Sequence, residues 1–289
     1  MNMDYCFLCG SKKSHIIHKG VRGNPSIDVL KCESCGLVRL SEFIRDSEEY
    51  YESSKMRNGD AESDIFDIRR AADKDDFRRY SFISSMIENK NYLDFGCGAG
   101  GVLRYSQNKA KYICGIELET KMLDALNSEG IKCFGSISQL KEEINKPFDV
   151  ISLFHVLEHL KKPLDILNEL SNLLTDDGCF VIEVPNSDDA LLSLYKCNEF
   201  ADFTYWESHL YLYNNFTFAR LIEKAGLRIR FLTQIQRYPL SNTLFWLSNG
   251  KPGGHKKWSA LSNNILDKEY ENALAKLGIA DTILAIVEK

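Results

Sequence analysis

The sequence predicts an open α/β fold built on a parallel, Rossmann-like sheet, and three observations lead to this prediction. An apolar run enters three glycines within Asp94–Gly101, and the pattern becomes helical from Val102. A second strand-like run, Tyr112–Ile116, follows that helix and ends at the acidic Glu117. Apolar residues make up 44% of the 289 residues, which is enough for a buried core. A strand, a glycine turn, a helix and a second strand form the nucleotide-binding corner of such sheets.

The glycines and the acid together indicate a nucleoside ligand. Glycine lets the backbone adopt tight-turn dihedral angles and leaves no side chain to hold a ligand away. A carboxylate at the tip of the second strand, as at Glu117, can accept hydrogen bonds from both hydroxyls of a ribose. A glycine loop by itself can be a plain turn, so the prediction depends on the acid.

The spacing D-x-G-x-G-x-G from Asp94 to Gly100 resembles motif I of the class I S-adenosylmethionine (SAM) methyltransferases. Later segments resemble that family in the same order. Phe148–Leu153 corresponds to its fourth strand, and His155–His159 corresponds to the loop and helix after that strand. Leu174–Val184 corresponds to the turn into its fifth strand and to the strand itself. The resemblance covers about Asp75–Gly226 and implies a seven-stranded Rossmann-like sheet with SAM as cofactor. A sheet that binds another nucleoside, or that has lost its ligand, is the alternative.

The family's cofactor site corresponds to a small set of positions in this sequence. The place where the family contacts the adenine matches Ser136, Ile137 and Ser138. The residues that the resemblance assigns to cofactor binding are Asp94, Gly96, Cys97, Gly98, Glu117, Ser138 and Phe154. They are expected to meet at the carboxyl ends of the strands, where ligands of this sheet type bind.

Length and charge limit the class of protein. The length suits one ordinary domain with a small appendage. The formal net charge of −5 gives no general attraction to phosphate backbones, so a nucleic-acid partner is not expected. No apolar run approaches the roughly 20 residues that cross a bilayer, and Met1–Cys6 lacks the features of a signal peptide. We therefore expect a reducing, cytoplasmic compartment; the oligomeric state stays open.

Four cysteines near the start predict a zinc-binding ribbon. Cys6 and Cys9 form one C-x-x-C knuckle, Cys32 and Cys35 form another, and a glycine follows each. Two such knuckles can present four thiolates to one tetrahedral Zn²⁺ ion. Disulfides, which are disfavoured in a reducing compartment, and a redox pair are the alternatives. The remaining cysteines are expected to be small core residues: Cys97, Cys114, Cys133, Cys179 and Cys197.

We expect three segments along the chain. They are a zinc ribbon at 1–42, a helical linker or cap at 43–90, and a SAM-dependent methyltransferase core at 91–289 with helical or loop inserts at 186–215 and 236–279. Two helices are expected between Ala61 and Asn89, the second with apolar residues at helical spacing that would pack on the sheet.

The first insert carries the candidate general base, His209. A histidine titrates near neutral pH, so it can accept a hydroxyl proton without a large pKa shift. Glu207–Tyr211 resembles the E-H-L segment of zinc-containing sugar C-methyltransferases, in which an adjacent Glu-His pair assists catalysis. Here Ser208 separates Glu207 from His209, which puts the transfer of that pair in doubt. A hydrogen-bonded structural role is the alternative for His209.

Two further segments carry candidate catalytic residues. Tyr50–Ser54, which includes Tyr51, resembles the tyrosine-rich segment that reaches the substrate in the same sugar methyltransferases. His155 begins an H-x-x-E-H sequence, which is also the inverted zinc-peptidase motif. Because this sequence follows a buried strand of the predicted SAM sheet, peptidase chemistry is not expected. His155 is expected to line the substrate side, and Glu158 and His159 to cap or brace a helix.

The resemblance implies methyl transfer to a small-molecule or glycan-type acceptor in a bacterial surface-polysaccharide or natural-product pathway. Ser208, and the lack of a longer C-terminal domain, favour O-methylation of a sugar hydroxyl over C-methylation of a nucleotide-linked keto sugar. RNA methylation and a non-catalytic zinc-ribbon scaffold are further alternatives. Gly250–Trp258 carries three lysines and is either a solvated loop or a clamp for a phosphate or nucleotide.

Overall fold

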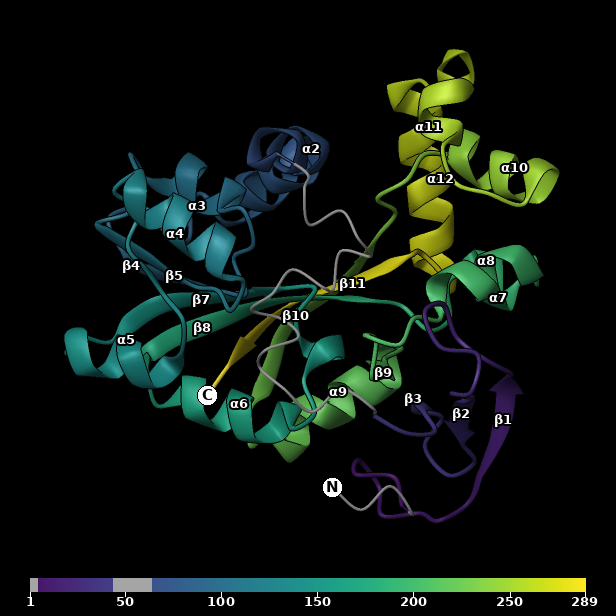
Figure 1. Cartoon of the computed structure of the whole chain (residues 1–289), viewed down its shortest axis with the longest axis horizontal. Helices are drawn as coiled ribbons and strands as arrows, with labels where there is room; N and C mark the ends of the chain where they lie inside the picture. Colours follow the sequence, from purple (N-terminus) through teal and green to yellow (C-terminus); the bar gives the residue numbers. More distant parts are fainter. Residues whose placement is uncertain (1–4, 44–63) are drawn as a thin grey trace. The chain divides into compact units, whose positions relative to one another are not determined.

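The structure is a computed structural model that describes residues 5–43 and 64–289, and these residues form two compact units (Figure 1). The first unit comprises 5–43, 157–161 and 183–285, and the second comprises 64–156, 162–182 and 286–289. The chain therefore passes between the units several times, and segments distant in sequence build each of them. None of the helices in the described ranges is both long and apolar enough to cross a bilayer.

A seven-stranded sheet confirms the predicted α/β architecture. Its strand order is β10–β11–β8–β7–β4–β5–β6. In chain order the strands are β4 (Asn91–Phe95), β5 (Tyr112–Ile116), β6 (Cys133–Phe134), β7 (Phe148–Phe154), β8 (Leu174–Pro185), β10 (Arg228–Ile235) and β11 (Thr282–Glu288). β4 is parallel to both β5 and β7, which lie on opposite sides of it. The strand order thus reverses at β4, and open α/β sheets bind ligands beyond the carboxyl ends of the strands at such a point.

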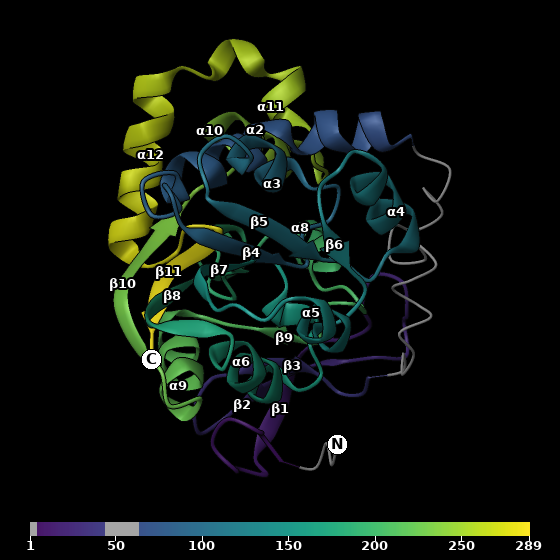
Figure 2. The ribbon, with the colours of Figure 1, turned by 90° about the vertical axis from the view of Figure 1, so that its left-hand side faces the viewer.

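Helices cover both faces of the sheet within the second unit. In Figure 2, α2 (Ile65–Ile83) and α3 (Gly101–Ser106) lie on one face, and α5 (Ile137–Glu143) and α6 (Pro163–Ser171) lie on the other. α4 (Thr120–Ser128) connects β5 to β6. Because both faces are covered, strands β4 and β7 are buried almost throughout, as expected for a parallel sheet.

Two local predictions are wrong. Within residues 64–89 there is one helix, α2, in place of two, because no glycine or proline interrupts it after Asp64 caps its first turn. The turn predicted at Leu174–Gly178 is instead the first part of the continuous strand β8. Gly178 serves packing there, since a Cβ at this position would lie 3.1 Å from the carbonyl oxygen of Phe148.

The N-terminal cysteines belong to a small sheet of the first unit. β1 (Ser14–His18), β2 (Val29–Cys32) and β3 (Val38–Leu40) are antiparallel neighbours, and β9 (Tyr211–Leu212) pairs with β3 as the fourth strand. The strand that follows His209 in the chain therefore completes the sheet of the cysteine ribbon.

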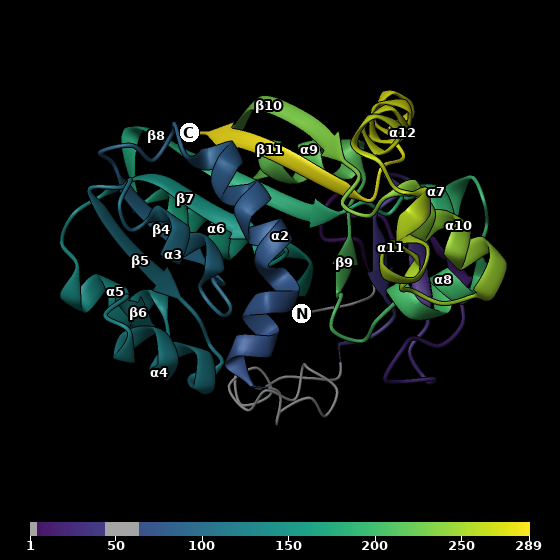
Figure 3. The same cartoon turned by 90° about the horizontal axis from the view of Figure 1, so that it is seen from above.

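The remaining helices of the first unit lie after β8. They are α7 (Ala190–Ser193), α8 (Asn198–Thr204), α9 (Asn215–Lys224), α10 (Leu240–Asn249), α11 (Gly254–Lys257) and α12 (Asn264–Leu277), of which the last three group together in Figure 3. Within Gly250–Trp258, the side-chain oxygen of Asn242 accepts the N–H groups of Gly253 and Gly254. A Cβ at Gly254 would lie 2.3 Å from the carbonyl oxygen of Ser241. Gly254 thus allows close packing of α11 on α10, which favours a structural role for it.

Candidate functional site

The loop after β4 has the backbone conformation that its glycines allow. Gly96 and Gly98 have φ angles of +74° and +53°, which other residues rarely adopt. The N–H groups of Gly96 and Cys97 both donate to the carbonyl of Ile116, at 2.8 and 3.1 Å, and fasten the loop to the end of β5. A Cβ at Gly96 would lie 2.5 Å from Val156, whereas one at Gly98 would meet nothing within 4 Å. The loop is therefore open at Gly98, where a ligand can approach the backbone.

Glu117 lies beside this opening. Its two carboxylate oxygens accept the N–H groups of Gly98, at 2.7 Å, and of Glu119, at 2.9 Å. Burial raises the pKa of Glu117, although these two N–H groups oppose the rise. Each oxygen can accept a second hydrogen bond. The carboxylate is thus held in a fixed orientation and keeps acceptor capacity for a pair of hydroxyls.

Asp94 is held in a buried hydrogen-bonded chain behind the loop. The hydroxyl of Ser152 donates to the Asp94 carboxylate at 2.5 Å, and the hydroxyls of Tyr92 and Ser152 lie 2.7 Å apart. Asp94 is 3% exposed. Burial raises its pKa to about 7, even though Ser152 and the charge of Arg79 lower it. The Asp94 carboxyl group therefore titrates near neutral pH.

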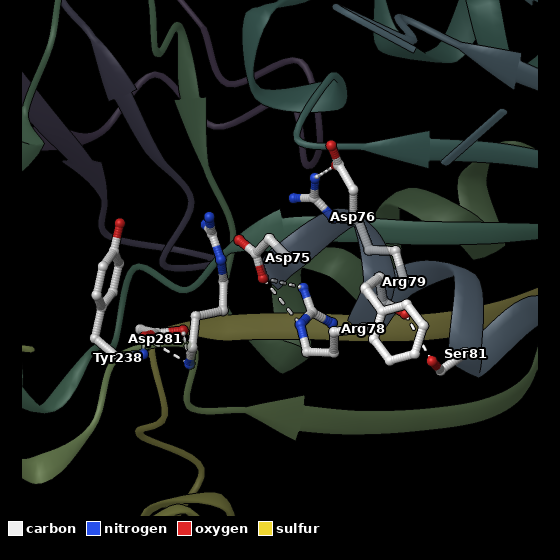
Figure 4. Close-up of polar contacts among 9 residues, drawn as sticks. Asp75, Asp76, Arg78, Arg79, Ser81, Tyr238 and Asp281 are labelled. Carbon is white, nitrogen blue, oxygen red and sulfur yellow. Dashed lines mark hydrogen bonds and ion pairs between the residues drawn. The ribbon is translucent and has the colours of Figure 1, made fainter. Parts of the chain in front are cut away.

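Arg79 and Ser152 are site residues that the sequence reasoning missed. The Arg79 guanidinium pairs with Asp76 at 3.4 Å (Figure 4) and lies 5.2 Å from the centre of the Phe154 ring. It places a cation at the end of β7 that could pair with a ligand carboxylate. A signal for each existed, because Arg79 is a charged residue among the apolar positions of α2, and Ser152 is polar between the apolar residues Ile151 and Leu153.

The other candidates of the second unit lie at strand ends. Ser136 accepts the N–H of Gln139 at 3.1 Å and so caps α5, while Ser138 is exposed on the first turn of that helix. Phe154 ends β7 and is 8% exposed. His155 follows it with a φ of +57°, an uncommon conformation for histidine. Ser138 and His155 are therefore the accessible polar side chains among these candidates.

The four ribbon cysteines come together as predicted. Cys6 and Cys35 have sulfurs 3.6 Å apart, those of Cys9 and Cys32 are 3.5 Å apart, and all four ligand atoms lie within 4.8 Å of one another. Burial alone would raise the pKa of Cys32, but the N–H groups of Cys35 and Ser34 outweigh it and lower the pKa to about 7. The cluster therefore favours a thiolate at Cys32.

His209 lies against a second polar group in the first unit. Its ring centre is 5.0 Å from that of His159 and 5.3 Å from that of Trp206. Ligand atoms of Glu158, His159 and His209 lie within 4.8 Å of one another. Glu158 and His159 form part of η3 (Leu157–His159), a 3₁₀ turn rather than a longer helix that they would brace. The structure thus brings two residues of the H-x-x-E-H sequence to His209.

Glu207, the other predicted member of the pair, contacts the ribbon. A Cβ at Gly23 would lie 2.6 Å from the Glu207 carboxylate, so Gly23 allows this close approach. Next to it, Arg22 lies over the rings of Phe203 and Trp206, at 4.6 and 4.8 Å from their centres. The ribbon therefore contacts the segment that carries His209. Tyr51 and its segment lie outside the described residues.

Residues 63–231 match a family described as methyltransferase domain, and this match covers more than half of the chain. The C-methyltransferase NovU of Streptomyces niveus is 24% identical over 208 residues, which are 70% of this chain and 47% of that protein. A ubiquinone biosynthesis O-methyltransferase of Actinobacillus pleuropneumoniae is 30% identical over 109 residues, 34% of this chain and 46% of that protein. The chain thus spans about half the length of the curated relatives it matches.

A solved structure supports the same fold. A SAM-dependent methyltransferase from Archaeoglobus fulgidus superposes on 74% of this chain and 92% of its own, with a TM-score of 0.51 and 18% identity. At this identity the likeness establishes a shared fold and leaves the acceptor open.

Proposed function

The chain belongs to the methyltransferase-domain family and is a SAM-dependent methyltransferase, and we propose that it methylates a hydroxyl group of a small-molecule or glycan-type acceptor. We propose that this acceptor is a sugar in a bacterial surface-polysaccharide or natural-product pathway. The observation that carries cofactor binding is the open loop at Gly98 beside the oriented Glu117 carboxylate. The small-molecule acceptor is supported by relatives named for C-methylation and for ubiquinone biosynthesis. We also propose that the protein is cytoplasmic.

The cofactor is held by the loop and the strand ends of the second unit. Glu117 accepts the ribose hydroxyls, and the backbone of Gly96, Cys97 and Gly98 lies along the ligand. Ser138 contacts the adenine, while Asp94 and Phe154 lie beside the methionine part of the cofactor. Arg79, 5.2 Å from the Phe154 ring, supplies the positive charge for the methionine carboxylate.

The ribbon holds a zinc ion through Cys6, Cys9, Cys32 and Cys35. Thiolates about 2.3 Å from a tetrahedral zinc are about 3.8 Å from one another. The two measured sulfur pairs, at 3.5 and 3.6 Å, are within a few tenths of an ångström of that separation. The geometry supports zinc as the organising ion of the β1–β3 sheet.

His209 is the proposed proton acceptor. SAM, when bound, supplies an activated methyl group. The hydroxyl oxygen of the acceptor bonds to the methyl carbon as the carbon–sulfur bond breaks, and the hydroxyl proton passes to the His209 imidazole. Holding the acceptor in line does much of the work, because the methyl donor is already activated. His155, Tyr51 and Glu207 are the proposed acceptor-contacting residues.

C-methylation of a nucleotide-linked keto sugar is the second candidate, because the NovU alignment covers 70% of this chain. A proton leaving carbon rather than oxygen would mark that reaction. RNA methylation would require strongly salt-dependent RNA binding. A scaffold without activity would not bind the cofactor at all.

Calorimetric titration with S-adenosylhomocysteine, the product form of the cofactor, tests the cofactor site. We expect binding that Gly98→Arg abolishes, because its side chain would fill the opening. Gly130→Arg is the matched control, since Gly130 also has a positive φ, +78°, and open space within 4 Å but lies outside the loop. Unchanged affinity in Gly98→Arg would contradict the proposal. Methyl transfer to a panel of sugars, nucleotide sugars and RNA then identifies the acceptor.

A further inference from the structure

The H-x-x-E-H sequence is not explained by cofactor binding or by the ribbon, and the structure gives two of its residues a new neighbour. Glu158 and His159 lie on η3, and His209 precedes β9. One potential ligand atom from each of these side chains lies within 4.8 Å of the others. These three residues, called here the Glu-His-His group, belong to the same unit. In the sequence, His209 follows His159 by 50 positions.

A hydrogen bond to the backbone fixes how His159 can act. Its Nδ1 atom lies 2.7 Å from the carbonyl oxygen of Ser208. Because a carbonyl only accepts, Nδ1 must carry the proton, and Nε2 of the neutral ring then has the lone pair. Ligation through one ring nitrogen, with the other donating to a backbone carbonyl, is the usual arrangement of metal-binding histidines. The residue adjacent to His209 therefore orients His159 for ligation.

The distances suit a single small cation. Two atoms that are each about 2.1 Å from one ion can be at most about 4.2 Å apart. The His159 Nε2 atom lies 4.0 Å from Oε1 of Glu158, within that limit. The longest separation in the group, up to 4.8 Å, exceeds this limit by about 0.6 Å.

The surroundings favour a positive charge at this position. Glu158 is fully buried, and a carboxylate away from water needs compensation by a partner of opposite charge. The attraction between this carboxylate and a divalent ion bound by the two imidazoles is stronger away from water than at the surface. Two imidazoles and one carboxylate suit transition ions such as Zn²⁺, Mn²⁺, Fe²⁺ or Co²⁺ better than Mg²⁺ or Ca²⁺.

We propose that Glu158, His159 and His209 bind one divalent transition-metal ion, separate from the cysteine cluster. The ligand set differs from that of the inverted zinc peptidases, because His155 belongs to the other unit and is not part of the Glu-His-His group. Three protein ligands leave room for a further ligand on the ion. With the ion bound, His209 would serve as a ligand and not as the proton acceptor proposed above, and the ion would supply Lewis-acid chemistry at its open position.

Cobalt titration of the full-length protein tests this site. A mild chelator first removes weakly held metal, and metal analysis verifies that zinc remains with the cysteines. We expect wild type to bind one equivalent of added Co²⁺, with visible absorption and no thiolate-to-cobalt charge-transfer band. His159→Gln should weaken this binding at least about tenfold while keeping its zinc. His155→Asn, which changes the other histidine of the sequence and suits its positive φ, should bind cobalt like wild type.

Three results would overturn the proposal: no cobalt bound by wild type, cobalt bound only with the charge-transfer band, or unchanged binding in His159→Gln. Glu158→Gln and His209→Gln provide the same test if His159→Gln does not fold, as judged by zinc content and S-adenosylhomocysteine binding. The metal site shares His209 with the proposed proton transfer, but its test is separate from that of cofactor binding. Cobalt binding without cofactor binding would leave the metal site standing and remove the methyltransferase proposal, and the reverse result would do the opposite.

Discussion

The glycine loop and the Glu-His-His group are both candidate sites, yet the chain builds them in different ways. The loop at 96–100 is formed by backbone dihedral angles and by N–H groups within about one strand, helix and strand of the sequence. The Glu-His-His group draws one side chain from the segment just before β9 and two from η3. The comparison teaches that a backbone site can be recognised from contiguous letters, whereas a side-chain site depends on how distant segments pair.

Loss of a zinc ligand should give the largest effect, in the unit that holds the Glu-His-His group and not at the glycine loop. Cys32→Ser should lose its zinc and unfold the β1–β3 sheet, because zinc binding contributes about 10–16 kcal/mol in small zinc modules. Metal analysis and hydrogen exchange measure the loss, which should extend to β9. Affinity for S-adenosylhomocysteine should stay within about twofold of wild type, since none of the proposed cofactor-binding residues belongs to the ribbon or to its unit. Ser34→Ala, in the same knuckle, is the control and should retain zinc.

His209→Asn should separate turnover from cofactor affinity. Loss of a proton acceptor, or of a ligand to the proposed ion, should lower kcat by about 10²–10⁴-fold. S-adenosylhomocysteine binding should not change, because the proposed cofactor-binding residues do not include His209. His15→Asn, an exposed ribbon histidine, is the matched control. Near-normal turnover in His209→Asn would reduce the residue to a structural role.

Stability should depend on pH through Asp94, on the loop side of the comparison. Its pKa is about 7 in the folded state, above the usual value of a carboxyl group. The folded protein thus binds more protons than the unfolded chain between about pH 4 and 7, so the free energy of unfolding should fall by up to a few kcal/mol as pH rises through that range. Urea unfolding of wild type and Asp94→Asn at several pH values measures the difference. An equal pH dependence in both proteins would exclude Asp94 as its source.

Glu117→Gln should weaken cofactor binding without disturbing the structure of the first unit. Losing charge-assisted hydrogen bonds to two hydroxyls should cost about 1.5–3 kcal/mol, or roughly ten- to a hundredfold in S-adenosylhomocysteine affinity. Glu143→Gln, which removes an exposed carboxylate paired with Lys132, is the control. Equal affinities for both variants would argue against ribose binding by Glu117.

Arg22→Gln should give the smallest effect and test the contact between the ribbon and the His209 segment. Its guanidinium lies over Phe203 and Trp206, and such contacts contribute about 0.5–2 kcal/mol. Faster hydrogen exchange at 203–209 and a modest loss of turnover are expected, with zinc retained. Arg70→Gln removes an exposed arginine that pairs with Asp67 and serves as control.

Several errors of the sequence analysis have the same origin. One continuous α2 replaced two expected helices because charged residues do not end a helix unless a cap or breaker does. Gly178 was taken for a turn, but it is required by the neighbouring Phe148 carbonyl, a contact absent from local sequence. The role of Glu207 stays a prediction, and its carboxylate lies close to Gly23, a neighbour that the local sequence does not show.

The sequence by itself determined the α/β class, the glycine loop with Glu117, and the cysteine knuckles. Each of these depends on residues close together in the chain, where dihedral preferences and ligand spacing act directly. Only the tertiary structure decided that Ser152 and Arg79 flank Asp94, and that Glu158 and His159 meet His209. Ser152 meets Asp94 because β7 pairs with β4. Glu158 and His159 meet His209 because η3 lies beside β9, which pairs with β3. Such pairing between distant segments is set by the packing of the whole unit.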